Sequence, residues 1–379
     1  MEDKLLNKYL SNDEVFKAIN KRFISLKDNE VERINVYLQQ VVETLIERMK
    51  LKDSLFNKTY NKIVFCGSFY KGTKVERPNE FDLNIILHLP INYNYVKLCS
   101  TLPAFIKIHI VVMELPDQNK LLMKDGYEVK IKVKKSGPAF TIILNIPHEI
   151  EDIHIDLAPA LVFNVFMIQQ FTTKFGILAD CRNKECFAIP VPLNNINFNG
   201  TRDHWRLSFF YQESEILRKC GSVKPVIRQM KKLRDVQNWK SIASYYIETL
   251  FYHKCIELED LDTMPSTLIL FTMLKELYNA CNRHQIKYFW NENYNLLEKI
   301  RQEEMSNITY RLNKIIKDIE KNIMNDSFIL AKYILCPPEL QILKEEINSI
   351  TQSENLENLQ NAIVNVITIF KTLWDVFRT

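Results

Sequence analysis

Two carboxylates, Glu80 and Asp82, stand two residues apart at the start of an apolar run that continues to Leu89. A strand here would place both acids on one face, because side chains alternate along a strand. Adjacent carboxylates repel each other, and a cation between them relieves the repulsion. Hard oxygen ligands suit Mg²⁺ or Mn²⁺, which bind through a few carboxylates and the phosphates of a substrate.

A Gly67-Ser68 turn precedes this acidic pair and follows the apolar run from Ile63 to Cys66. Neither the dipeptide nor the pair is informative alone. In this order, on a turn and then on the next strand, they favour a nucleotidyl-transfer site. The alternative is a solvated strand start that carries two acids by chance.

Two-metal chemistry needs a third carboxylate, since paired ions about 4 Å apart bracket the attacking and leaving oxygens. Asp156 is the candidate, because alternation over Ile153 to Leu161 sets it on a polar face with apolar residues behind it. Neighbouring strands in a sheet would bring it beside Asp82. Asp152 is the local competitor, and it is disfavoured because it precedes the β-branched run.

The elements that would position these acids differ along the chain. Residues 13–51 show a long helical pattern that breaks near 26–29, with Asn12 or Asp13 as the expected N-cap. Residues 60–165 are rich in β-branched and aromatic runs separated by polar turns. The clearest strands in this block are expected at residues 127–133 and 140–146.

The second half of the chain is expected to be mainly helical. Residues 165–204 predict an irregular connection because of their prolines and an Asn-rich stretch. Helical spacing dominates from residue 205. Packed helices are expected at residues 268–278 and 363–377, and a helix over 331–335 should end at Cys336-Pro337-Pro338.

Composition restricts the class of protein. The chain has 379 residues, 46% of them apolar, and a net charge of +4, which allows two or three packed units. With only 7 glycines there is no glycine-rich phosphate loop. No apolar run approaches the ~20 residues of a membrane span. The 8 cysteines lack dense pairing, so a reducing, cytoplasmic location is expected.

Gly67-Ser68 followed by Glu80-Phe81-Asp82 resembles the active-site signature of the cyclic GMP-AMP synthase family, a branch of the polymerase-β-like nucleotidyltransferases. The Glu-x-Asp order after Pro78-Asn79 is closer to this branch than the Asp-x-Asp of oligoadenylate synthases. The resemblance implies an α+β fold: a bilobed nucleotidyltransferase with a mixed or antiparallel catalytic sheet, a long N-terminal spine helix and a C-terminal helical lobe. The expected units are residues 1–58, 59–200 and 201–379.

Three later segments extend the resemblance in family order: His204 to Phe209, residues 224–234 and Ile242 to Thr249. The resemblance implies that Glu80, Asp82 and Asp156 hold Mg²⁺ or Mn²⁺ and carry catalysis. The residues that it implies for base and phosphate binding are Ser68, Arg206, Ser208, Lys231 and Tyr245, the last by stacking on a base. Cys66 departs from the hydroxyl residue that precedes Gly-Ser in the vertebrate enzyme.

The zinc ribbon with which the vertebrate enzyme clamps DNA is missing, because residues 211–224 offer only Cys220. Cys181, Cys186 and His204 lack tetrahedral zinc spacing, and His154 is interpreted as a packing or orienting residue. Insect members without the ribbon sense double-stranded RNA, so RNA is the expected activator and DNA the less favoured one. The basic residues expected to contact it are Lys224, Arg228, Lys232, Lys50, Lys52 and Arg22.

The expected function is a double-stranded-RNA-activated synthase that joins ATP and GTP into a cyclic GMP-AMP, an innate immune second messenger for a STING-type receptor. The resemblance leaves open a dimer or a higher assembly on RNA. One alternative is a catalytically silent binding protein of the male-abnormal developmental type. Another is a synthase of linear oligonucleotides. The presence of all three acids favours the cyclic dinucleotide synthase.

Overall fold

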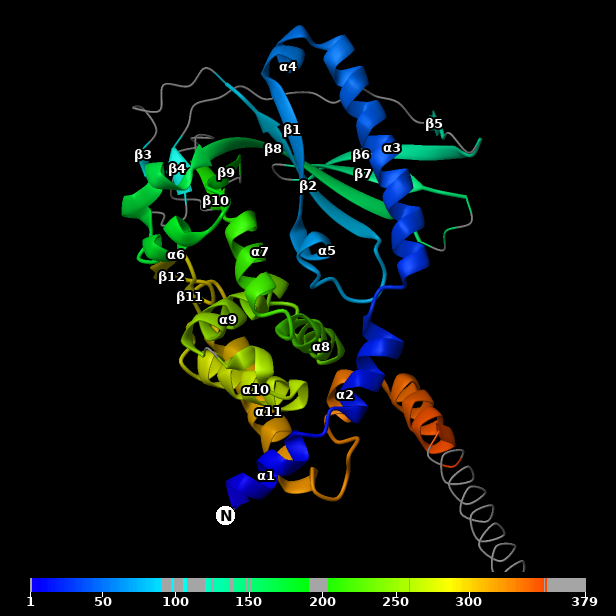
Figure 1. Cartoon of the computed structure of the whole chain (residues 1–379), viewed down its shortest axis with the longest axis vertical. Coiled ribbons are helices and arrows are strands. Elements are labelled where there is room, and N and C mark those ends of the chain that lie inside the picture. The colour runs from blue at the N-terminus through cyan, green and yellow to red at the C-terminus, as the bar shows by residue number, and fades with distance from the viewer. Residues whose placement is uncertain are drawn as a thin grey trace, which may run out of the picture.

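The computed structural model of this chain describes residues 2–89, 97–98, 105–107, 120–123, 126–136, 139–147, 149, 151–190, 204–258, 260–350 and 352. A twisted sheet forms one part of the molecule, and most of the later helices gather in a second part beside it (Figure 1). A long N-terminal helix lies along the sheet (Figure 1). The predicted α+β, bilobed architecture with its spine helix is therefore confirmed.

The N-terminal helices are α1 (Glu2–Leu10), α2 (Glu14–Ile19), a π-helical turn η1 (Asn20–Ile24), α3 (Asp28–Lys52) and α4 (Ser54–Thr59). The chain leaves helical geometry at residues 25–27, so the predicted break is confirmed, about one residue early. The spine helix α3 runs for 25 residues and buries one apolar stripe. That stripe is Ile34, Leu38, Val41, Val42, Leu45, Ile46 and Met49.

Asp13 caps a different helix from the one expected. Its carboxylate accepts hydrogen bonds from the backbone N–H groups of Ser266 (3.0 Å) and Thr267 (2.8 Å), at the start of α10 (Ser266–Asn282). The Asn12 side chain accepts from the Glu14 backbone N–H at the start of α2 (2.8 Å). Asp13 thus joins the N-terminus to the helical part of the molecule and satisfies donors of a helix end.

The strands are β1 (Tyr60–Cys66), β2 (Glu80–Leu87), β3 (Lys97–Leu98), β4 (Phe105–Lys107), β5 (Lys120–Leu122), β6 (Glu128–Ser136), β7 (Ala139–Asn145), β8 (Ile153–Asn164), β9 (Glu185–Pro190) and β10 (His204–Ser208). They form one sheet in the order β3-β4-β10-β9-β8-β7-β6-β5, and β2 pairs with both β1 and β8. The β2–β8 pairing is parallel, and the other pairings in this sheet are antiparallel. The predicted mixed sheet is confirmed.

Two sequence expectations are wrong. The irregular connection predicted for residues 165–204 instead contains a 3₁₀ segment η3 (Val165–Phe171), the helix α6 (Phe175–Asp180) and the strand β9. Residues 204–208, read as the start of the helical part, are the strand β10, which pairs with β9 and β4. Strands this short carry little periodic signal, so tertiary pairing decides their state.

The helical part comprises α7 (Phe210–Lys219), α8 (Val223–Val236), α9 (Ser244–Glu257), η4 (Leu261–Thr263), α10, α11 (Gln302–Asn322) and α12 (Ala331–Ile334). A short hairpin of β11 (Lys287–Tyr288) and β12 (Asn291–Asn295) lies between α10 and α11. The helix predicted at residues 268–278 lies within α10, and α12 ends before Cys336 as expected. Helix resumes at residue 337, and the helix predicted at 363–377 lies outside the described residues.

One core runs through both parts, from the buried stripe of α3 through the sheet to the helices around Phe251 and Trp290. Of the helices in the described part of the chain, none combines the length and the apolar composition that a membrane span requires.

Candidate active site

The Gly67-Ser68 turn joins β1 to a single helical turn, α5 (Gly67–Lys71). Gly67 adopts a left-handed φ of 74°, which favours glycine. A Cβ atom at this position would lie 1.8 Å from Oδ2 of Asp82. Only glycine therefore lets α5 begin directly against Asp82, with the partly exposed Ser68 next to it.

The pairing of β2 with β8 sets Asp82 directly opposite Asp156 on adjacent parallel strands. Glu80, two residues earlier, is opposite His154. Register partners point to the same face of a sheet, so all three acids share one face. Adjacent strands are about 4.8 Å apart, which brings the carboxylates of Asp82 and Asp156 within reach of one ion. Asp152 precedes β8 and accepts a hydrogen bond from Asn145 instead (3.0 Å).

The carboxyl group of Asp82 is crowded although the residue as a whole keeps an exposed surface. Enclosure of this group between β2 and the start of α5, together with the charges of Glu80 and Asp156, raises its pKa to about 6. Lys74 and Lys71 oppose the rise. A bound cation would remove this repulsion, which is the physical signature of a site built for positive charge.

The other two acids have partners of their own. Lys74 Nζ lies 2.7 Å from Oε2 of Glu80, and Thr141 Oγ1 donates to Oδ1 of Asp156 (2.5 Å). In the described residues, no three histidine, cysteine, aspartate or glutamate side chains are arranged closely enough to hold a metal ion. Glu80 is instead paired with Lys74.

The donor set nevertheless fits Mg²⁺ or Mn²⁺. It consists of carboxylate oxygens on two adjacent strands, and Glu80 is 59% exposed and able to turn. Cys66 is not part of it: the thiol is buried, donates to the Val64 carbonyl (3.2 Å), and has its pKa raised to about 12 by burial and by the charge of Asp82.

The other residues expected to bind the base and phosphates lie on the strand β10 of the sheet and on the helices α8 and α9. Arg206 is exposed on β10 and Ser208 is partly exposed at the end of that strand. Tyr245 is in the first turn of α9, and its hydroxyl donates to Oε1 of Glu213 (2.7 Å). Its ring lies 6.3 Å from that of Tyr288, and part of the residue stays accessible.

Four buried charges link the Gly-Ser turn to the helical part, and we call them the interlobe ion cluster: Lys71, Glu213, Lys231 and Glu248. Lys71 Nζ lies 2.6 Å from Oε2 of Glu213 and 3.2 Å from Oε2 of Glu248. Lys231 Nζ lies 2.6 Å from Oε1 of Glu248. The charges balance, as burial of ionised groups requires.

Neutral partners complete this cluster. Thr73 Oγ1 (2.7 Å) and Tyr252 Oη (2.9 Å) donate to Glu248, and Trp290 Nε1 donates to Glu213 (3.1 Å). Burial by itself would raise the pKa of Glu248, but Lys71 and Lys231 hold it well below its usual range. Sequence patterns did not identify Lys71, Glu213 or Glu248, because their partners are far away along the chain.

Lys231 is therefore placed differently from an open phosphate ligand. It is 3% exposed, and its ammonium also donates to the Thr73 carbonyl (3.0 Å). Burial lowers its pKa, while Glu248 opposes that effect. A nucleotide would reach Lys231 only if these contacts opened.

The residues expected to bind nucleic acid do not form one open surface. Lys232 is 8% exposed and pairs with Glu76 and Glu339. Arg228 is partly buried, and its Nη1 donates to the Gly72 carbonyl (3.1 Å). These two side chains belong to the contact between α8 and the loop after α5.

The other four residues predicted to bind nucleic acid have side chains that are at least partly accessible. Arg22 pairs with Glu346 (3.0 Å) and Lys50 with Glu47 (2.8 Å), whereas Lys52 is exposed and Lys224 partly so. Exposed ion pairs are worth little, so Arg22 and Lys50 could exchange their partners for phosphate at small cost.

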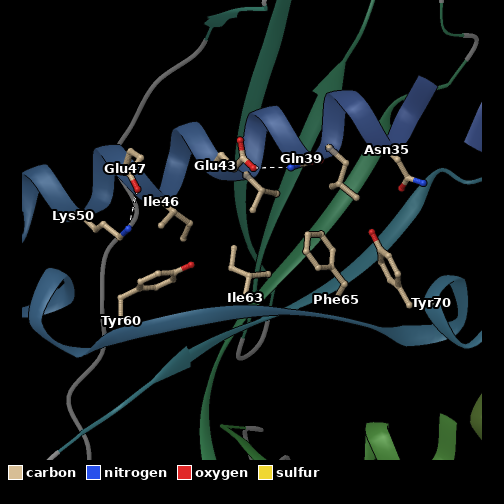
Figure 2. Close-up of a pocket in the computed structure, with 12 residues that line it drawn as sticks. Asn35, Gln39, Glu43, Ile46, Glu47, Lys50, Tyr60, Ile63, Phe65 and Tyr70 are labelled. Atoms are coloured by element: carbon tan, nitrogen blue, oxygen red, sulfur yellow. Dashed lines mark hydrogen bonds and ion pairs between the residues drawn. The ribbon is translucent and has the colours of Figure 1, made fainter. Parts of the chain in front are cut away.

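A pocket of about 540 Å³ lies between α3 and β1. Figure 2 shows side chains of α3, among them Gln39, Ile46 and Lys50, above Ile63 and Phe65 of β1. Ile63 and Phe65 are on the opposite face of the sheet from Asp82, because Cys66 is the register partner of Asp82. This pocket is therefore separate from the three acids.

Comparisons with known proteins identify the family. Residues 97–219 match the family model of the Mab-21 protein nucleotidyltransferase domain, and residues 222–314 match that of the Mab-21 protein HhH/H2TH-like domain. The chain is 34% identical to a cyclic GMP-AMP synthase-like receptor of Microplitis demolitor, over 90% of this chain and 71% of the relative.

Two further cyclic GMP-AMP synthase-like receptors are similar over nearly the whole chain. The protein of Trichogramma pretiosum is 33% identical over 95% of this chain and 83% of its own length. That of Aethina tumida is 31% identical over 93% of this chain and 98% of its own length. From these similarities and the nucleotidyltransferase match, we conclude that the chain belongs to the cyclic GMP-AMP synthase-like receptor family.

Proposed function

We propose that this protein is a nucleic-acid-activated synthase that joins ATP and GTP into a cyclic GMP-AMP. The observation that carries the proposal is the register of β2 and β8, with Asp82 opposite Asp156 and Glu80 on the same face. Double-stranded RNA is the proposed activator, and the product would be a cytoplasmic second messenger of antiviral innate immunity, read by a STING-type receptor. The cyclic GMP-AMP synthase-like names of the relatives support the proposal of cyclic GMP-AMP synthesis.

In the proposed reaction, Glu80, Asp82 and Asp156 hold Mg²⁺ or Mn²⁺, which supplies neutralisation of charge at the α-phosphate. A ribose hydroxyl attacks the α-phosphate in line, the new O–P bond forms, and the bond to pyrophosphate breaks. Thr141 occupies Oδ1 of Asp156, so Oδ2 is the oxygen able to receive the hydroxyl proton. The linear dinucleotide then reorients in the site, its free ribose hydroxyl attacks the α-phosphate of its remaining triphosphate, and the ring closes as a second pyrophosphate leaves.

Other residues would position the nucleotides. Ser68, at the start of α5, would donate to the triphosphate beside the acids. The accessible part of the Tyr245 ring would stack on a base, and its hydroxyl bond to Glu213 fixes the ring orientation. Arg206 and Ser208 would contact base and phosphate, and Lys231 would hold α8 against the loop that carries Thr73.

The test is product analysis after incubation with ATP, GTP and Mn²⁺, with double-stranded RNA, double-stranded DNA or neither. We expect a nuclease-resistant cyclic dinucleotide with RNA, and none from Asp82→Asn. If no activator yields a cyclic product, the synthase proposal is wrong.

A second candidate is a nucleotide-binding protein without catalysis, and the ion pair of Lys74 with Glu80 favours it. Thermal stabilisation by nucleotide with and without Mg²⁺ separates the two functions. A synthase should need the metal and lose the stabilisation in Asp82→Asn. A silent binder should show the same stabilisation in each case.

A further inference from the structure

Three lysines line one face of β6. Lys130, Lys132 and Lys134 are all exposed, whereas the intervening Ile131 is buried and Val133 is partly buried. Consecutive lysines in this row are about 6.7 Å apart, because they are two residues apart on a strand. No ion pair joins any of the three to an acid within the described ranges. We call this row the β6 lysine stripe.

Strand register places this stripe on the same face as the catalytic acids. Lys134 pairs with Thr141, Thr141 with Asp156, and Asp156 with Asp82, on four successive strands. The hydrogen bond from Thr141 to Asp156 shows directly that both side chains point to this face. A parallel row runs from Lys132 through residues 143 and 154 to Glu80.

The stripe lies on the opposite side of the acids from the Gly-Ser turn. The strand order across this face is β1, β2, β8, β7, β6, with Ser68 following β1 at one end and Lys134 at the other. Two strand spacings, about 10 Å, separate Asp156 from Lys134 along the backbone. The flexible four-carbon stem of lysine lets its ammonium reach across much of that distance.

We propose that the β6 lysine stripe binds the 5′-polyphosphate of the acceptor nucleotide. This inference rests on the proposed synthase function and assigns the two sides of its site. The donor triphosphate occupies the Ser68 side, where α5 meets Asp82. The acceptor then lies over β8 and β7, and its own phosphates extend toward β6, where lysine ammonium groups act as point charges.

The length of the β6 lysine stripe favours a nucleotide over a nucleic-acid duplex as its ligand. The stripe spans about 13 Å, from the first to the third lysine. A duplex is usually held through many phosphate contacts over a longer surface, and double-stranded RNA domains span about 16 base pairs. A short row ending beside the carboxylates matches a small polyanion bound at the same site.

The experiment compares wild type with the double variant Lys132→Gln/Lys134→Gln. The control is Lys314→Gln/Lys317→Gln, which removes the same charge from exposed positions on α11. Equilibrium binding of ATP, GTP, adenosine and guanosine is measured at constant ionic strength with Mg²⁺. Initial rates are measured with GTP, GMP or guanosine as the varied acceptor and ATP as donor. Melting temperatures check folding.

We expect the stripe variant to bind triphosphates about five- to thirtyfold more weakly, from the loss of two exposed charge contacts. Nucleoside binding should not change, and the KM for GTP should rise while that for guanosine does not. Lys132→Arg/Lys134→Arg should restore triphosphate affinity. The α11 control should behave as wild type.

Three outcomes would overturn the assignment. Triphosphate affinity could be unchanged, nucleoside affinity could fall equally, or only RNA affinity could fall, which would make the stripe part of a nucleic-acid surface. The binding arm does not need turnover. If the wild-type protein makes no product, the synthase proposal is wrong. The phosphate-site proposal still holds in that case if the stripe variant binds triphosphates more weakly than the wild type.

Discussion

Removing the negative charge of Glu248 tests whether the interlobe ion cluster stabilises the fold. Glu248→Gln keeps the shape of the side chain but leaves Lys231 without a counterion and Lys71 with only Glu213. Both lysines are buried, with 3% of the surface of Lys231 and 7% of that of Lys71 exposed. Breaking a buried pair by removing one partner costs about 3–5 kcal/mol, because the remaining charge is uncompensated.

That loss is large enough to measure by thermal unfolding. A chain of 379 residues has an unfolding entropy of about 0.8 kcal/mol/K, so a loss of about 4 kcal/mol lowers the melting temperature by about 5 °C. Glu257→Gln is the control, because Glu257 ends the same helix and is 58% exposed. It should shift stability by less than about 0.5 kcal/mol. A loss below about 1 kcal/mol in Glu248→Gln would refute the reasoning.

The effect should also depend on pH. The folded protein holds the pKa of Glu248 below its usual range, so the carboxylate contributes stability above its unfolded pKa of about 4.3. This contribution is lost as the pH falls below that value, because the unfolded state then binds a proton that the folded state does not. The stability gap between wild type and Glu248→Gln should be largest near pH 7 and should narrow in acid. A gap that stays constant from pH 7 to pH 3 would contradict this linkage.

Two further predictions concern the acids and the turn. Asp82→Asn should abolish Mn²⁺ binding, measured through the paramagnetic signal of free Mn²⁺, and should reduce product formation by at least about a hundredfold. The control Asp152→Asn should change neither Mn²⁺ binding nor product formation. Equal losses in the two variants would exclude a specific role for Asp82. Gly67→Ala should destabilise the protein by about 1–3 kcal/mol and disable the site, because its Cβ would overlap Asp82. Gly126→Ala has a similar φ of 86° but open space around it, so it should lower stability in denaturant titration without loss of activity. Full activity in Gly67→Ala would contradict the close contact.

Local patterns were sufficient for the elements that carry the acids. The alternation at Glu80 and Asp82, and again before Asp156, predicted strands with one polar face, and the first residues of β2 and of β8 alternate in that way. The helical spacing of residues 13–51 predicted the spine, because an apolar stripe at period 3.6 needs only neighbouring residues to be recognised. These features depend on residues a few positions apart.

Tertiary structure alone decided which distant residues meet. Lys71 contacts Glu248 across 177 positions of sequence, and no local pattern marks this lysine as buried. The strand β10 is only five residues long and exists because β9 and β4 pair with it. Alternation indicates which residues of a strand share a face but not which strands are neighbours. The order β2, β8, β7, β6 is therefore what brings Asp82 and Lys134 to one surface.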